Sequence, residues 1–345
     1  MAVRGQIPDE SNNKRSDAVT RIAVIGAGLS GLVFAKSLGD VAEVRLFEKS
    51  RGCGGRMSTR RHEAFQFDHG AQFFTARSKS LQSFLQPFLA AGVVARWDAR
   101  FVEISGDRIS SRRSWSGEHP HYVGVPGMNA LGRALGEELD ISLGTRVEQI
   151  CGGPGDRRLL DSEGRDLGRF DWVVSSIPAR QVSALMPGEF SHLDAVKGCS
   201  MPGCYSLMLG FTQPLPLEWD AALVKDAAIS WISVDNSKPG RDGGTSLLVQ
   251  ASNQWAEANM ELANDFVTAQ LVAETGRVIG QDVGGAEHVA LHRWRYANPG
   301  QHEGVHSLID VQQQLVAMGD WCIRGRVESA FLSGLDAAQR IRELI

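Results

Sequence analysis

Residues 26–31 read Gly-Ala-Gly-Leu-Ser-Gly, and this glycine spacing narrows the possible folds more than any other feature of the sequence. The residues before it, 22–25, are Ile-Ala-Val-Ile, a short apolar run typical of a buried parallel strand. Residues 29–38 have the pattern of a helix, and residues 44–48 predict a second strand. The order strand, glycine-rich turn, helix and strand predicts a right-handed βαβ unit.

Each glycine of this turn has a different task in a dinucleotide-binding βαβ unit of the Rossmann type. Gly26 permits the tight turn, Gly28 lets a pyrophosphate approach the main chain, and Gly31 lets the helix pack closely against the strand. The amino end of the helix offers free N–H groups and the positive end of its dipole to phosphates. Glu48, at the end of the second strand, can accept hydrogen bonds from both ribose hydroxyls of an adenosine. These residues predict a dinucleotide site and leave the choice between FAD and NAD open.

The segment after Glu48 is rich in glycine and basic residues, reading Lys-Ser-Arg-Gly-Cys-Gly-Gly-Arg-Met over residues 49–57. Gly55 and Arg56 could bring main-chain N–H groups and a guanidinium close to a second phosphate. A flexible basic surface loop would have the same composition. The segment alone therefore does not decide between a second phosphate contact and a solvated loop.

Composition and charge exclude several classes of protein. The net charge is −4, so no overall positive field favours nucleic acid or an anionic membrane. No apolar run approaches the ~18 residues of a membrane span. The five cysteines are widely spaced and include no CxxC pair, which favours reduced thiols in a cytoplasmic protein, and no histidine or cysteine pattern predicts a metal site. Residues 1–20 lack the apolar core of a signal peptide, and we interpret them as a flexible tail.

The middle of the chain departs from the βαβ pattern. Residues 128–139 and 259–275 predict helices. Apolar runs predict further strands at residues 172–178, 204–211, 230–234 and 246–252. We therefore predict an α/β protein in which a dinucleotide-binding domain, assembled from separated stretches, is interleaved with a mixed α+β substrate domain. The expected ranges are 21–77, 122–180 and 292–345 for the dinucleotide-binding domain, and 78–121 and 181–291 for the substrate domain.

Further segments extend the pattern along the chain. Residues 67–75 read Phe-Asp-His-Gly-Ala-Gln-Phe-Phe-Thr. Together with the 48–60 run they resemble the flavin-containing amine oxidase superfamily, and specifically its renalase branch. Later stretches that match in order are residues 123–128, 231–238, 292–296 and 319–330. The resemblance covers nearly everything from Arg21 onward and implies a p-hydroxybenzoate hydroxylase/amine oxidase-like FAD-binding fold.

The resemblance also implies FAD as the resident cofactor and suggests which residues contact it. By position these are Ser30, Glu48, Arg56, Gln72 and Phe73, with main-chain contacts from Val147 near the adenine, Asp320 at the ribityl or pyrophosphate region and Val327 beneath the flavin. Other interpretations remain open, because an aspartate can cap a turn and a valine can simply be core. The monoamine oxidases attach flavin through a cysteine shortly before the carboxyl-terminal turn. This chain has no cysteine between Cys204 and Cys322, so we expect non-covalent FAD.

Members of the renalase branch oxidise 2- or 6-dihydro isomers of NAD(P) to NAD(P)⁺, with O₂ reduced to H₂O₂. The resemblance implies the same donor here, with Phe73, Asn236 and Trp294, and less strongly Gln250, lining the substrate pocket. Each has a plainer interpretation, since aromatic residues are often core and Asn236 suits a turn. No catalytic residue is predicted, because a labile hydride needs no base, and the oligomeric state is left open.

Two other functions stay open at this point. A flavin amine or polyamine oxidase should show a lysine near the flavin, and Lys197, Lys225 and Lys238 are the lysines of residues 181–291. A non-catalytic, FAD-binding redox protein would hold flavin without turning over either class of donor.

Overall fold

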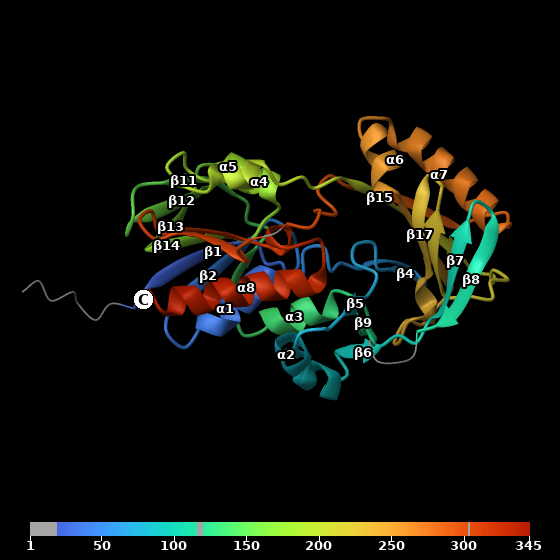
Figure 1. Ribbon diagram of the computed structural model, residues 1–345, viewed down its shortest axis with the longest axis horizontal. Coiled ribbons are helices and arrows are strands. Elements are labelled where there is room, and N and C mark those ends of the chain that lie inside the picture. The colour runs from blue at the N-terminus through green and yellow to red at the C-terminus, as the bar shows by residue number, and fades with distance from the viewer. Residues whose placement is uncertain (1–18, 116–119, 303) are drawn as a thin grey trace, which may run out of the picture.

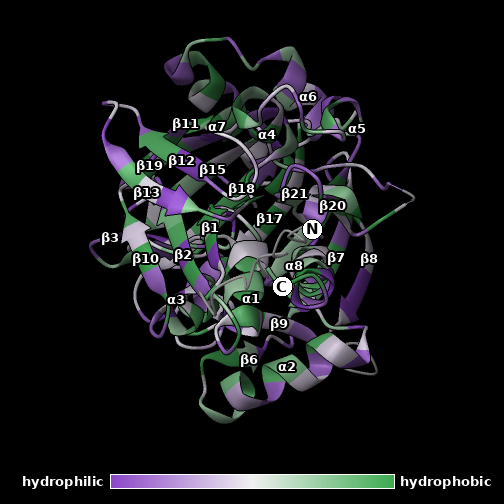
Figure 2. Ribbon diagram, turned by 90° about the vertical axis from the view of Figure 1, so that its left-hand side faces the viewer, coloured by the Kyte–Doolittle hydropathy of each residue, from purple (hydrophilic) through white to green (hydrophobic). Residues whose placement is uncertain are grey.

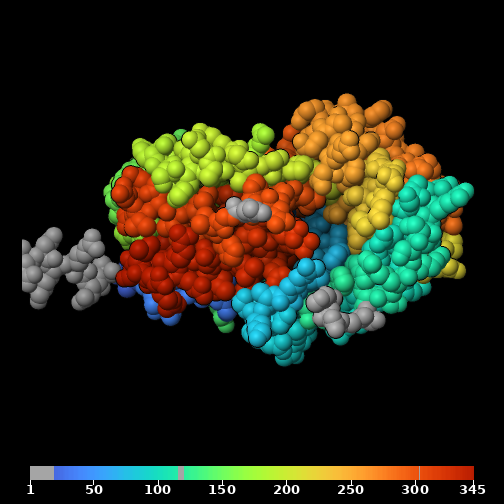
Figure 3. Space-filling view, viewed as in Figure 1, coloured from blue at the N-terminus to red at the C-terminus, as the bar shows by residue number. Residues whose placement is uncertain are grey.

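The computed structural model describes residues 19–115, 120–302 and 304–345, and the expected tail at 1–20 lies almost wholly outside them. The molecule is elongated, with a layered dinucleotide-binding half and a second half built around an antiparallel sheet (Figure 1). In the space-filling view the surface is hollowed where the two halves meet (Figure 3).

The first half is a six-stranded sheet in the order β10-β2-β1-β14-β21-β20. All neighbouring strands are parallel except the edge pair β21 and β20. The strands are β1 (Arg21–Ile25), β2 (Glu43–Glu48), β10 (Asp140–Leu143), β14 (Trp172–Ser175), β20 (Ser307–Asp310) and β21 (Leu315–Met318). The predicted βαβ opening is confirmed, because α1 (Leu29–Leu38) joins β1 to β2.

Strand alternation divides the apolar residues of this sheet between two cores. Ile22 and Val24 pack on the face covered by α1 and α8 (Val327–Arg342), whereas Ala23 and Ile25 pack on the opposite face. Over that second face lies a small antiparallel sheet of β11 (Val147–Cys151), β12 (Arg157–Asp161) and β13 (Asp166–Phe170) (Figure 1). The parallel strands are thus buried on both sides, as their continuous apolar runs indicate.

The second half is a seven-stranded sheet in the order β19-β15-β18-β17-β16-β7-β8, antiparallel except for the parallel pair β16 and β7. The strands are β7 (Arg100–Ser105), β8 (Arg108–Ser114), β15 (Cys204–Phe211), β16 (Ala221–Lys225), β17 (Ile229–Val234), β18 (Thr245–Ala251) and β19 (His288–Trp294). Helices α6 (Asn253–Ala258) and α7 (Asn264–Ile279) pack against it.

Between the halves lie a hairpin and a small sheet. They comprise β3 (Arg60–His62), β4 (Phe65–Phe67), β5 (Phe74–Thr75), β6 (Val94–Arg96) and β9 (His121–Gly124). Helix α2 (Lys79–Ala90) lies below them, and α3 (Ala130–Gly136) follows β9 (Figure 1). Segment 60–75 runs from the dinucleotide-binding half to the antiparallel sheet, which places its polar residues at the junction.

Packing departs from the expected domain ranges at two boundaries. Helices α4 (Ala179–Leu185) and α5 (Leu193–Lys197) fall mostly in the expected substrate range, yet their apolar side chains share a core with Ala23 and Ile25. At the other boundary, β19 keeps residues 292–294 in the antiparallel sheet, although 292 is the expected start of the last dinucleotide-binding stretch. Both differences arise from long-range packing that apolar periodicity does not record.

Two predicted helices also have different bounds. The helix expected at 259–275 is found as α7, which ends at Gly280 in the left-handed conformation with φ +66°. A separate short helix, α6, precedes it because the Ser252 hydroxyl accepts a hydrogen bond from Trp255 N at 3.3 Å and caps an earlier start. The helix expected at 128–139 is shorter, as α3.

Candidate cofactor and substrate site

The glycines of the 26–31 turn differ in their surroundings as their predicted tasks require. Gly26 has φ +101°, a conformation that side-chain-bearing residues rarely adopt. A Cβ on Gly31 would lie 2.3 Å from the Gly26 carbonyl oxygen, so helix and strand touch through this glycine. A Cβ on Gly28 would meet nothing within 4 Å. The turn therefore presents an open main-chain face at Gly28, where a pyrophosphate is expected.

The second glycine segment lies directly on this turn. Gly54 N donates to the Ala27 carbonyl at 2.8 Å, and Gly54 forms an isolated parallel bridge with Gly28. A Cβ on Gly55, whose φ is +57°, would lie 3.3 Å from Gly28 Cα. The start of α1 has no side-chain cap, so its amide donors remain for a ligand. The 49–57 segment is therefore part of the same cradle rather than a separate surface loop.

Glu48 links the two glycine segments through its carboxylate. Oε2 accepts from Ala27 N and Oε1 accepts from Ser50 N, each at 2.8 Å. The residue is 6% exposed. A carboxylate has about four lone-pair sites, so these two bonds leave acceptor capacity for ribose hydroxyls.

Arg56 and Asp320 come together although 264 residues separate them in sequence. Arg56 Nη2 donates to Asp320 Oδ1 at 2.5 Å, and Nη1 donates to the Ala297 carbonyl at 2.7 Å. The Asp320 side chain is 6% exposed and that of Arg56 is 31% exposed. The pair joins the 49–57 segment to the turn before α8, and Arg56 keeps donors that an anion could use.

The other predicted cofactor contacts are distributed around this cradle. Ser30 is buried in α1, and its carbonyl oxygen lies only 2.4 Å from where a Cβ on Gly334 would be, so α1 and α8 are in close contact there. Val147 is buried at the start of β11 in the same core as Phe47. Val327 is the first residue of α8 and is half-buried. Their contacts with a cofactor stay predictions.

Gln72 braces the 67–75 segment. Its Nε2 donates to the Asp68 carbonyl at 2.5 Å and the Gly70 carbonyl at 3.1 Å, and its Oε1 lies 2.8 Å from the Ser233 hydroxyl on β17. Both ends of the side-chain amide thus bind the protein. Gln72 holds its neighbour Phe73 in place from the junction of the two halves.

Phe73 opens onto a cavity of about 330 Å³ walled by rings. The lining residues are Phe73, Phe101, Trp115, His121 and Trp231, with Leu223 and Arg113. Trp115 stacks on His121 with ring centroids 3.7 Å apart and planes within 9°. Phe73 lies 4.6 Å from Trp115 and 5.4 Å from Trp231, centroid to centroid. We call this cavity the aromatic pocket.

The aromatic pocket was not predicted from the sequence, apart from Phe73. Three of the rings belong to separate segments: Trp115 follows β8, His121 starts β9 and Trp231 lies on β17. Trp231 is more than a hundred residues from the other two in the sequence. The only available signal was the aromatic content of segments that alternate as strands. The parallel pairing of β7 with β16, which brings these strands to one place, has no local sequence pattern.

The other three residues expected to line the substrate pocket do not border the aromatic pocket. Asn236 Oδ1 accepts from Ser246 N at 3.0 Å, which makes it a turn residue. Gln250 Nε2 donates to the Gly70 carbonyl at 2.9 Å, and Trp294 Nε1 donates to the His69 carbonyl at 2.7 Å. Gln250 and Trp294 therefore support the 67–75 segment from the antiparallel sheet.

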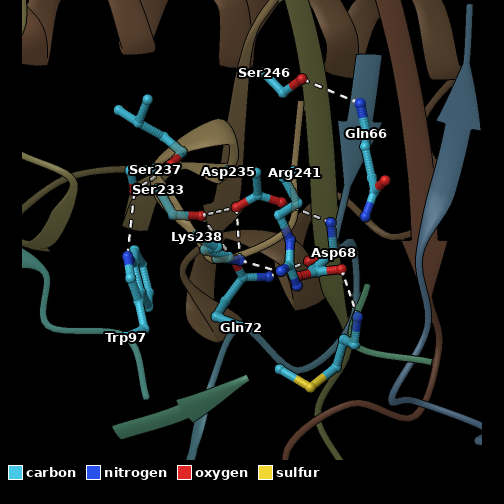
Figure 4. Close-up of polar contacts among 12 residues, drawn as sticks. Gln66, Asp68, Gln72, Trp97, Ser233, Asp235, Ser237, Lys238, Arg241 and Ser246 are labelled. Atoms are coloured by element: carbon cyan, nitrogen blue, oxygen red, sulfur yellow. Dashed lines mark hydrogen bonds and ion pairs between the residues drawn. The ribbon is translucent and has the colours of Figure 1, made fainter. Parts of the chain in front are cut away.

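A cluster of four buried charged side chains, one of them Asp68 of the 67–75 segment, joins the two halves (Figure 4). Asp68 Oδ2 lies 2.5 Å from Arg241 Nη2 and 3.3 Å from Lys238 Nζ, and Asp235 Oδ1 lies 2.7 Å from Lys238 Nζ. All four side chains are at most 1% exposed. We call these residues, Asp68, Asp235, Lys238 and Arg241, the charge cluster.

Hydrogen bonds complete the charge cluster. Asp68 N donates to Asp235 Oδ2 at 2.6 Å, and Asp68 Oδ1 accepts from Thr59 and from Met128 N. Burial opposes ionisation of Asp68, but Lys238 and Arg241 outweigh it and hold the pKa of Asp68 below its usual value. Burial raises the pKa of Asp235, whose one cation, Lys238, is shared with Asp68.

Two histidines next to the charge cluster are kept neutral. His69 stacks on Trp294 with centroids 5.4 Å apart and meets His292 edge-on at 4.9 Å. Burial lowers the pKa of His69 to about 4, with His292 and Arg60 adding repulsion. Burial, with help from Arg60, lowers the pKa of His292 to about 4 as well. The site thus holds two uncharged imidazoles at neutral pH.

Two features of the described residues bear on the class of protein. None of their helices has the length and apolar character needed to cross a membrane. Within the same residues, histidine, cysteine, aspartate and glutamate side chains form no group of three or more that could hold a metal ion.

Solved structures with a similar fold include several oxidases, at identities that show the fold alone. A candidate protoporphyrinogen oxidase from Exiguobacterium sp. 255-15 is 14% identical, and the match covers 95% of this chain and 100% of that one with a TM-score of 0.79. Putrescine oxidase bound to putrescine is 12% identical over 94% of this chain and 99% of that one, with a TM-score of 0.69. A double mutant of putrescine oxidase, redesigned in its cofactor binding, has a TM-score of 0.71 at 12% identity over 94% and 100% of the two chains.

Family patterns match two stretches of the sequence. Residues 24–88 match the NAD(P)-binding Rossmann-like domain, which agrees with the glycine cradle around Gly28. Residues 99–342 match the flavin containing amine oxidoreductase pattern, and this stretch is well over half of the chain. The protein therefore belongs to the flavin-containing amine oxidoreductase family.

Proposed function

We propose that this protein is an FAD-dependent oxidase that takes a hydride from aberrant dihydronicotinamide dinucleotides, 2- or 6-dihydro-NAD(P), to give NAD(P)⁺ and, with O₂, H₂O₂. The observation that carries the proposal is the aromatic pocket, which shares Phe73 with the 67–75 segment and in which, among the residues that the structure describes, the charged lining residue is the cation Arg113. In this proposal the protein acts in the cytoplasm in the repair of damaged metabolites, on a small-molecule substrate and without nucleic acid or a membrane.

The residues of the cradle fit FAD. The open face at Gly28 and the uncapped start of α1 suit a pyrophosphate, and Glu48 keeps acceptor sites for the ribose. Arg56 can add a charged donor. Cys322 lies in the turn before α8, and burial raises the pKa of its thiol, so it stays protonated and unreactive. These features support non-covalent FAD.

When bound, the flavin supplies the hydride-accepting and O₂-reducing chemistry. The chain supplies binding, orientation and exclusion of water. The stacked rings of Trp115 and His121, with Phe73 and Trp231, suit a flat heteroaromatic ring such as nicotinamide. Gln72 fixes Phe73 at the junction, so the donor ring is held by a rigid wall.

The amine oxidase alternative has less support from the same site. An ammonium substrate would enter a pocket whose charged lining residue, Arg113, repels it. Among the lysines considered above, Lys238 is held in the buried charge cluster, and Lys225 donates to Glu103 at 2.7 Å on the surface. Lys197 is exposed beside Asp194. None of the three lines the aromatic pocket.

Anaerobic mixing of the purified yellow protein with 2-, 4- and 6-dihydro-NAD(P) tests the proposal, with bleaching of the flavin absorbance as the measurement. We expect rapid bleaching by the 2- or 6-isomer and slow or no bleaching by the 4-isomer. Bleaching by putrescine or another amine, and by none of the dihydronicotinamides, would contradict it. A flavin that neither class reduces would favour a non-catalytic redox protein.

A further inference from the structure

We propose that the aromatic pocket selects a planar ligand that carries negative charge, and that Arg113 is the residue that recognises this charge. For turnover the inference rests on the proposed function, because it names the substrate feature that the same site reads. Ligand binding tests it separately.

The walls of the aromatic pocket set the shape of the ligand. Phe101 stacks on Trp115 with ring centroids 5.1 Å apart and an angle of 20° between the ring planes. These two rings are therefore stacked face to face and do not meet edge-on. A cavity of about 330 Å³ is at the small end for ligand sites and accommodates one ring system rather than a whole dinucleotide. The remainder of a larger substrate must extend out of the mouth of the pocket.

Besides His121, the aromatic pocket is lined by two residues whose polar groups are donors, Arg113 and Trp231. The Arg113 guanidinium lies over the Phe101 ring, with Cζ 4.5 Å from the centroid, which fixes its position at the wall. Trp231 is 9% exposed, and its Nε1 is buried without a hydrogen-bond partner among the described residues. No carboxylate lines the pocket within that part of the chain. An acceptor-bearing anion complements both donors, whereas an amine complements neither.

Arg113 is only loosely held by the protein's own acid. Its Nη2 lies 3.7 Å from Glu103 Oε1, while Lys225 binds the other oxygen of Glu103 at 2.7 Å. The Arg113 side chain is 58% exposed, so a ligand anion can reach its remaining donors. Glu103 therefore places the guanidinium without saturating it.

The strand itself offers a matched control. β8 is an edge strand that consists of arginine and serine apart from Ile109, and successive side chains of a strand point to opposite faces (Figure 2). Arg112 therefore points away from the aromatic pocket, and it pairs with Glu218 at 3.6 Å. Arg112→Gln and Arg113→Gln remove the same charge from adjacent positions, but only the second removes it from the pocket.

The binding test titrates the flavin-loaded protein with benzoate, phenyl phosphate, benzamide and benzylamine, and follows tryptophan fluorescence and flavin absorbance. We expect one or both anions to bind more tightly than benzamide and benzylamine, and the preferred anion distinguishes a carboxylate from a phosphate group. Arg113→Gln should weaken anion binding by about tenfold to a hundredfold, the range for a charge-assisted hydrogen bond. Arg113→Lys should recover part of the lost anion affinity. Arg112→Gln should bind the anion as tightly as the parent protein does.

Two outcomes would overturn the inference: benzylamine binding as tightly as either anion, or equal effects of Arg112→Gln and Arg113→Gln. Melting temperatures of both variants check that they fold.

Where a dihydronicotinamide reduces the flavin, Arg113→Gln should raise KM for the phosphate-bearing dinucleotide while the KM of the corresponding riboside and both kcat values change little. If no dihydronicotinamide is a donor but anion binding still depends on Arg113, the proposed function fails and the inference stands.

Discussion

The cofactor cradle and the charge cluster treat polar groups in opposite ways. In the cradle, the main-chain face at Gly28 is open, α1 starts without a side-chain cap, and the one ion pair, Arg56 with Asp320, leaves Arg56 partly exposed. In the charge cluster, Asp68 and its three partners are at most 1% exposed and bind one another. Polar groups are thus left open where a ligand is to bind, whereas the ionised groups of the charge cluster pair with one another where the two halves join, although Arg241 Nε is buried without a partner among the described residues.

The largest expected effect comes from breaking the charge cluster. Asp68→Asn removes the carboxylate that pairs with Arg241 and leaves Lys238 with Asp235 alone, and removing one member of a buried ion pair costs about 3–5 kcal/mol of folding free energy. We expect a large fall in melting temperature. Asp40→Asn is the control, because its pair with Arg342 is exposed at the surface and such pairs contribute about 0–1 kcal/mol. Similar melting temperatures for the two variants would show that burial does not distinguish these ion pairs.

The next effect separates the two functions of the glycine turn. Gly31→Ala places a Cβ against the Gly26 carbonyl, so we expect it to destabilise the flavin-free protein by about 1–3 kcal/mol, as overpacking does. Gly28→Ala meets open space, so we expect the flavin-free melting temperature to stay the same while flavin content falls. Thermal melts of the apoprotein measure its stability, and the ratio of flavin to protein absorbance measures the flavin content. A Gly28→Ala protein with full flavin content would mean that no phosphate lies against this residue.

The third expected effect is a pH dependence at the junction. The pKa of both His69 and His292 is about 4 in the folded protein, below the ordinary value near 6.5 of an unfolded chain. Between these values the unfolded state binds more protons, so stability is complete above pH 6.5 and falls as the pH drops towards 4. Melting temperatures at pH 7.5 and pH 5 should therefore differ less in His69→Gln/His292→Gln than in the parent. An unchanged difference would locate the acid sensitivity elsewhere.

The sequence predicts the cofactor cradle better than the substrate side, for a physical reason. Gly26, Gly28, Gly31 and Glu48 act through local geometry, since the turn and the following strand lie within one βαβ unit. The pairing of Arg56 with Asp320 was not predicted, because the resemblance implied only that each residue contacts FAD and nothing in either segment records contact across 264 residues.

The aromatic pocket and the charge cluster lie beyond such local patterns. The pocket depends on β7 pairing with β16, and the cluster depends on residues 68 and 235–241 meeting at the junction. Asn236 shows a different difficulty, because its match to a family segment predicts a pocket role and its side chain also accepts a hydrogen bond from Ser246 N, as a turn residue does. Polar residues that satisfy one another leave no periodicity by which a sequence could reveal them.

The position of β21 in the first sheet has a consequence for synthesis. One neighbour of β14 is β1, from the start of the chain, and the other is β21, from residues 315–318. The helix α8 that packs on α1 also comes late, from residues 327–342. A nascent polypeptide on the ribosome can form the opening βαβ unit long before these residues emerge. The sheet behind the glycine cradle is therefore completed only after residues 315–342 have been made, and a chain that stops before them would carry every glycine of the cradle with no completed sheet behind it.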